Sequence, residues 1–128
     1  MRHALLVSTL CVLVTGAAEL AALAQKRANV AGTWLLSVDV GDTHGMPTVV
    51  LRQKGGMLTG TITNPRGQQP LTGTVEGREA VFAFEVVRDG TPMTAVYRGT
   101  VESTRKMTGT VEFTGALTGS GTWVATKK

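Results

Sequence analysis

Apolar and polar residues alternate in short runs along most of the chain after residue 32. One five-residue pattern occurs four times, at 58–62, 71–75, 97–101 and 107–111: a large apolar residue, any residue, Gly, Thr and a second large apolar residue. Successive side chains of a β-strand point to opposite faces, so each copy puts its apolar residues and its glycine on one face. The pattern predicts β-strands that each have a single dry face.

The alternation extends beyond these four copies and predicts eight strands separated by short turns. The expected strands are 33–40, 48–53, 57–63, 71–76, 80–86, 93–102, 107–113 and 119–126. Turn residues separate many of them, as in Lys54-Gly55-Gly56, Asn64-Pro65-Arg66-Gly67 and Arg88-Asp89-Gly90-Thr91. Glycine, proline and asparagine favour such positions because they supply the backbone angles of tight turns. The longest expected loop, 41–47, follows the first strand.

Short turns restrict how these strands can pair. Neighbouring strands must be mostly antiparallel, because parallel pairing needs a crossover of about a dozen residues or more. A flat meander would leave two unpaired edges, whereas closing the first strand onto the last removes both edges and hides the apolar face. We therefore predict an all-β fold, a small eight-stranded antiparallel up-and-down barrel. A β-sandwich of the same strands is the alternative.

The first 24 residues follow a different pattern. A short basic start precedes a nearly uncharged apolar run over 4–18, and Ala22-Leu23-Ala24 supplies the small residues that a signal peptidase requires. The apolar run is shorter than a membrane-spanning helix needs, and Glu19 interrupts it. We expect a cleaved N-terminal signal peptide, a secreted or periplasmic protein, and no stable membrane insertion after cleavage. The predicted divisions are a signal peptide at 1–24, an N-terminal lead-in at 25–31 and a β-barrel domain at 32–128.

Composition changes this picture little. The single cysteine, Cys11, lies in the predicted signal peptide, so the mature domain must rely on hydrophobic burial and sheet hydrogen bonds without disulfides. The formal net charge is +4, but its basic pairs lie at predicted chain ends and turns and do not alternate with aromatic residues. Such pairs are usually solvated charges at strand ends, so we expect no nucleic-acid partner.

Two short motifs resemble those of known barrels. Ala31-Gly32-Thr33-Trp34 resembles the Gly, any, Trp signature of lipocalins, and Gly32-Thr33-Trp34 followed by Leu58-Thr59-Gly60-Thr61 is similar to the first two strands of avidins. Both families are calycin barrels. The resemblance implies that Trp34 closes one end of the barrel and that Trp123 packs beside it. The chain departs from lipocalins because its last strand has no clear counterpart of the arginine that lies across their tryptophan. It departs from avidins because it lacks inward polar groups for biotin.

The residues expected to face inward are almost wholly apolar, and only the Tyr97 hydroxyl and two indole N–H groups offer hydrogen bonds. A ligand in such a lumen would be mainly apolar, with one polar end held by Tyr97. We expect lipocalin-like binding of a small apolar ligand by Trp34, Leu36, Phe82, Phe84, Tyr97, Phe113 and Trp123. The alternative is a barrel filled by its own side chains. In that case the protein is a non-catalytic structural or protein-interaction module, with the outward row Val81, Ala83 and Val96 as its candidate surface.

Residues suited to catalysis are scarce. The expected mature chain has one histidine, His44, and none of its serines lies in a nucleophile motif. Asp39, Asp42 and His44 cluster in the first loop and could ligate a divalent cation, although aspartate is also an ordinary turn former. We expect no enzyme activity and no catalytic residues, cofactor or metal. The oligomeric state is left open.

Overall fold

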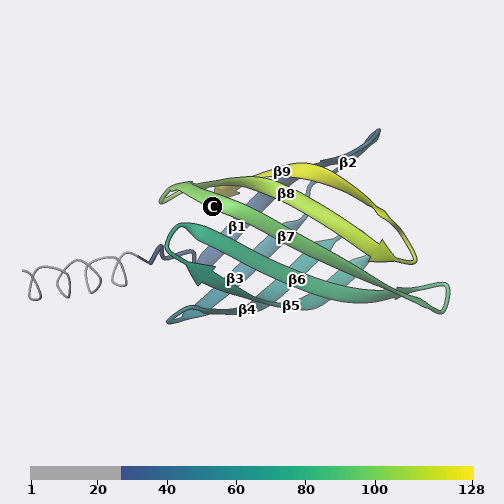
Figure 1. Cartoon of the computed structure of the whole chain (residues 1–128), viewed down its shortest axis with the longest axis horizontal. Helices are drawn as coiled ribbons and strands as arrows, with labels where there is room; N and C mark the ends of the chain where they lie inside the picture. Colours follow the sequence, from purple (N-terminus) through teal and green to yellow (C-terminus); the bar gives the residue numbers. More distant parts are fainter. Residues whose placement is uncertain (1–26) are drawn as a thin grey trace, which may run out of the picture.

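A computed structural model describes residues 27–128, and these residues form one antiparallel sheet of nine strands. The predicted signal peptide and its cleavage site lie outside the described residues. Figure 1 shows the strands wrapped around a common axis. They are β1 (Gly32–Val40), β2 (Thr43–Gly45), β3 (Thr48–Lys54), β4 (Met57–Asn64), β5 (Gly67–Glu76), β6 (Glu79–Arg88), β7 (Thr91–Ser103), β8 (Lys106–Gly115) and β9 (Gly119–Lys127). The described part of the chain contains no helix with the length and hydrophobicity needed to cross a membrane.

The sheet closes between its first and last long strands. β1 pairs with β3 on one side and with β9 on the other, where the register runs from Trp34 opposite Lys127 to Asp39 opposite Thr122. Each of the other long strands pairs with its neighbours in the sequence. The predicted eight-stranded antiparallel up-and-down barrel is therefore confirmed, with β2 as an additional short strand. The β-sandwich alternative is wrong, because a single sheet closes on itself.

β2 lies within 41–47, which we predicted to be a loop. It pairs with Val38–Val40 in the same register that β3 keeps with Gly32–Leu35, so β2 and β3 form one interrupted arm opposite β1. The interruption is at Met46 and Pro47. The Leu36 N–H donates to the Pro47 carbonyl at 3.0 Å, but proline has no N–H to complete the ladder. The β1–β2 hairpin extends past the barrel wall (Figure 1).

One end of the barrel is sealed by the lead-in that precedes β1. Val30 and Trp34 are fully buried, and the indole N–H of Trp34 donates to the Val30 carbonyl at 2.9 Å. The Gln53 side chain accepts from the Val30 N–H at 2.8 Å and donates to the Ala28 carbonyl at 2.9 Å. The Lys127 ammonium lies 5.7 Å from the Trp34 ring centroid, within cation–π range. These contacts hold the lead-in and the end of β9 against the start of β1, and together they close this end of the barrel.

The glycines of the four repeated patterns permit close approach between strands. A Cβ on Gly60, Gly73 or Gly109 would collide with a backbone carbonyl oxygen of the adjacent strand. At Gly99 it would lie 2.5 Å from Cζ2 of Trp123, so this glycine leaves the space that the indole occupies. Inward glycines therefore allow the sheet to coil tightly and admit a large ring into a narrow barrel.

Candidate functional site

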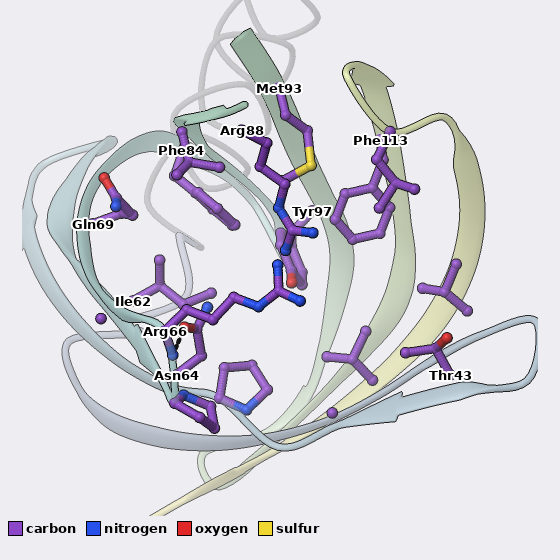
Figure 2. A pocket seen from close by; sticks show the side chains of 18 of the residues that line it. Thr43, Ile62, Asn64, Arg66, Gln69, Phe84, Arg88, Met93, Tyr97 and Phe113 are labelled. Carbon is purple, nitrogen blue, oxygen red and sulfur yellow. Dashed lines mark hydrogen bonds between the residues drawn. The ribbon is translucent and has the colours of Figure 1, made fainter. Parts of the chain in front are cut away.

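The end of the barrel opposite Trp34 is hollow. A cavity of about 900 Å³ opens there, bounded by the β4–β5 and β6–β7 turns, the β8–β9 loop and the β1–β2 hairpin. Figure 2 looks into this space, with Phe84 and Phe113 on opposite sides and Tyr97 between them in the view. The lumen is thus divided into a packed half and an open half.

The wall of the open half follows from strand pleat and register. Every second residue of a strand points inward, so cross-strand neighbours form successive layers around the barrel. Tyr97 belongs to the deepest of the layers that reach the cavity from β6, β7 and β8. The next layer toward the mouth joins Phe84, Ala95 and Phe113, and the outermost joins Val86, Met93 and Gly115. Ile62 and Val38 line other parts of the wall, and Gln69, the cross-strand partner of Ile62, adds a polar side chain to these apolar surfaces.

An aromatic cluster forms the boundary between the two halves. The Tyr97 ring stacks on Phe82 with centroids 5.1 Å apart and an interplanar angle of 6°, and its centroid lies 6.2 Å from that of Phe84. Trp123 approaches Phe82 and Tyr97 edge-on at 5.8 and 5.9 Å. The Trp123 indole N–H donates to the Thr110 carbonyl at 2.8 Å, which fixes the ring. Such pairs favour defined ring orientations, so the floor of the cavity is preformed.

Tyr97 provides a polar group at this floor. Its side chain is almost fully buried, and burial raises the pKa of its phenol to about 12. Its hydroxyl has no hydrogen-bond partner among residues 27–128, and Tyr97 lines the cavity. The phenol is therefore neutral at physiological pH and can donate a hydrogen bond to a molecule in the cavity.

Two arginines lie at the mouth. Arg66 belongs to the β4–β5 turn and Arg88 ends β6, and Figure 2 shows their side chains reaching over the cavity with the guanidinium groups directed toward one another. Neither arginine is within ion-pair distance of a carboxylate in residues 27–128, including the neighbouring Asp89. With Asp89 as the one acidic residue among those that line the cavity in residues 27–128, the mouth carries a net positive charge.

The rim also carries exposed apolar side chains. Met46 lies between β2 and β3, Val87 near the end of β6 and Leu117 between β8 and β9, and their exposed fractions are 70%, 66% and 45%. All three line the opening of the cavity. Single exposed apolar residues are common on proteins, but these three surround one opening.

The seven predicted ligand-binding residues fall into two groups. Phe84, Tyr97 and Phe113 line the cavity. Trp34, Leu36, Phe82 and Trp123 are at most 2% exposed and pack in the core without lining it. All seven share the inward face, and alternation gives no information on depth along the barrel axis. Arg66 and Arg88 were not predicted to belong to a site, because turn residues of this kind are usually solvated.

The first-loop cluster lies apart from the cavity lining. Asp39 and His44 are cross-strand partners in the β1–β2 hairpin, and Nδ1 of His44 lies 2.7 Å from Oδ1 of Asp39. Their side chains are 62% and 52% exposed, respectively. Asp42 does not join them in a ligand group, since no three His, Cys, Asp or Glu side chains gather within residues 27–128. His44 does not line the cavity.

Comparisons of the chain with protein-family models, with curated proteins and with solved structures gave no match.

Proposed function

We propose that this protein is an exported, non-catalytic barrel that binds one small, largely apolar molecule in the open half of its lumen. The observation that carries the proposal is the cavity of about 900 Å³, lined by aromatic and aliphatic side chains over a preformed floor. Ligand pockets typically enclose roughly 300–1,000 Å³ and combine an apolar wall with a few polar groups. The cavity has both features.

Free energy favours occupation of this space. Side chains such as Ile62, Phe84 and Phe113 turn apolar surface toward a cavity that is open to water. Removing apolar surface from water contributes roughly 25 cal/mol per Å². An apolar ligand would remove part of both its own surface and the cavity wall from water, with little reorganisation of the stacked floor.

The same proposal includes export from the cytoplasm and a lipocalin-like character. Secretion or periplasmic delivery rests on the apolar run and the small residues before Gln25. A lipocalin-like character rests on Gly32-Thr33-Trp34 at the start of β1 and on the closed barrel. A carrier of apolar molecules is consistent with both, because such molecules are poorly soluble outside membranes.

The test is a titration of the purified protein with an uncharged apolar fluorophore, N-phenylnaphthylamine, whose emission rises in an apolar site. We expect saturable binding of one molecule per chain. Val86→Trp should weaken it, because Val86 lines the cavity and the larger indole would occupy part of that space. Val81→Trp is the matched control, since Val81 lies on the same strand but belongs to the outward-facing set. Absence of saturable binding, or equal binding by the two variants, would contradict the proposal.

A second candidate function is protein interaction through the outer wall of β6 and β7. Ala83 and Val96 are direct cross-strand partners, and Val81 lies two residues from Ala83 on the same face. All three are half-buried. Size-exclusion chromatography and cross-linking test this candidate: a self-associated species lost in Val96→Lys would support it, and a strict monomer with no captured partner would remove it.

A further inference from the structure

We propose that the ligand is an amphiphile with one negatively charged head group, of the type of a long-chain carboxylate. Its head would lie between Arg66 and Arg88 at the mouth, and its tail would lie on the apolar wall below. This inference rests on the proposed function and adds the chemical class of the ligand.

The two arginines are held on defined backbone turns. The Asn64 side-chain oxygen accepts a hydrogen bond from the Arg66 backbone N–H at 2.9 Å, which shapes the β4–β5 turn. Arg88 pairs with Thr91 across a two-residue turn in which Asp89 and Gly90 both have positive φ, 51° and 80°. This is the backbone of a tight hairpin turn. Both guanidinium groups are thus carried to the same mouth by turns far apart in the sequence.

The charges at the mouth favour an anion. Two guanidinium groups directed toward one another repel, and no carboxylate within residues 27–128 pairs with either. Asp89 is the one acidic residue among those that line the cavity in the described chain, so the arginines leave a net positive charge. An anion placed between them would relieve the repulsion. The planar guanidinium donors match the two oxygens of a carboxylate in particular.

The remaining surface fits an apolar tail. Ile62, Phe84 and Phe113 line the wall below the arginines, and Met93 also lines the cavity. The buried Tyr97 phenol is uncharged, so it attracts an anion less strongly than the arginines do. These positions orient the head toward the mouth and the tail toward the floor.

The test compares how well two molecules displace N-phenylnaphthylamine from the full chain at low ionic strength: a long-chain carboxylate and the alcohol of the same chain length. We expect the carboxylate to bind roughly tenfold more tightly, the scale of one charge-assisted hydrogen bond. Arg66→Gln and Arg88→Gln should each reduce this ratio several-fold, and the double variant should bring it near one. The ratio should also fall with added salt, because the mouth is open to solvent.

The matched control is Arg98→Gln, which removes the same charge from an exposed position of β7 away from the cavity. It should leave the ratio unchanged, and thermal unfolding checks that all variants fold alike. Equal affinity for the two ligands in the wild type would overturn the head-group assignment while leaving the proposed function intact. An Arg98→Gln effect as large as that of the mouth variants would also overturn it. If the fluorophore itself does not bind, the proposed function fails and this inference fails with it.

A further arm separates a free carboxylate from a membrane lipid as the source of the charge. Because N-phenylnaphthylamine itself partitions into bilayers, binding to vesicles of anionic phospholipid is measured by co-sedimentation of the protein without the fluorophore. Displacement by the free carboxylate that is lost in the double arginine variant supports the single-chain ligand. Co-sedimentation that is lost in the double arginine variant, without displacement by the free carboxylate, would contradict that ligand and point to a phospholipid head group at the mouth.

Discussion

Tyr97 links the two halves of the barrel at the scale of one residue. Its ring stacks on Phe82 in the packed core, and the same side chain lines the open cavity. It is the single tyrosine of the chain, so its ionisation can be observed without interference from other phenols. The residue therefore reports directly on how dry the floor of the cavity is.

Tyr97 should make the fold less stable at high pH. Burial raises the pKa of its phenol to about 12, whereas the phenol of the unfolded chain ionises near pH 10. Below pH 10 both states are protonated; between about pH 10 and 12 only the unfolded state loses its proton, so the free energy of unfolding falls. The expected loss is about 2–3 kcal/mol.

Urea unfolding at about pH 9 and about pH 12 measures this loss, with Tyr97→Phe as the comparison. The tyrosine-dependent part of the loss should be absent from Tyr97→Phe, which removes the ionisable group and keeps the ring. Phenolate absorbance of the folded protein should rise with a midpoint far above pH 10. A midpoint near pH 10, or the same pH dependence in both proteins, would show that the floor is wet.

Gly109 should not tolerate even a methyl group. A Cβ there would collide with the Arg98 carbonyl oxygen and lie 2.5 Å from Cα of Gly99, both on the adjacent strand. Gly109→Ala should therefore lower the free energy of unfolding by about 1–3 kcal/mol, the usual cost of overpacking. Gly45→Ala is the control, because no atom lies within 4 Å of a Cβ at that position. Similar stabilities of the two variants in chemical denaturation would contradict the close approach of the strands.

At the scale of elements, alternation was sufficient to predict the eight long strands but not all of their ends. β5 begins at Gly67, whereas its alternation was recognised only from residue 71. The missed residues, Gly67-Gln68-Gln69-Pro70, are polar or small because they border the mouth of the cavity, where Gly67 and Gln69 line it. β2 was missed because Thr43-His44-Gly45 has no apolar alternation. Its pairing depends on β1 continuing in the same register beyond the barrel.

The lead-in before β1 packs against the closed end of the barrel, a contact that strand alternation does not indicate. Val30 is fully buried at the closed end, and its N–H depends on the side chain of Gln53. The lead-in around Val30 is too short to show a hydrophobic period. Val30 is buried through tertiary contacts that include Gln53, and strand alternation does not indicate this role of the glutamine.

Gln53→Ala should loosen this seal. The substitution removes hydrogen bonds to the Val30 N–H, the Ala28 carbonyl and the Gly55 carbonyl, and leaves part-buried backbone groups without partners. We expect the free energy of unfolding to fall by about 1–3 kcal/mol. Gln68→Ala, at an exposed position of β5, should change it little. Hydrogen exchange at the Val30 amide gives a second readout, and unchanged protection in Gln53→Ala would contradict the role of the glutamine.

At the scale of the molecule, the barrel is filled at one end and hollow at the other. The sequence left open whether the lumen is filled or open, and the structure has a filled half and a hollow half along the same axis. The inward face of each strand could be predicted from its period of two residues. The depth of a residue along the barrel axis could not be predicted, so Trp34 and Phe84 were placed in one site although they lie in different halves. The arginines could not be recognised either: an antiparallel meander places the β4–β5 and β6–β7 turns at one end, but strand alternation does not show that the side chains of Arg66 and Arg88 reach over the lumen.

The most direct test of the hollow half is a crystal structure of the protein grown with N-phenylnaphthylamine. The account predicts one probe molecule between Phe84 and Phe113, above the ring of Tyr97, with the packed half unchanged. A lumen filled by protein side chains at that place, or a probe bound only on the outer wall, would contradict it.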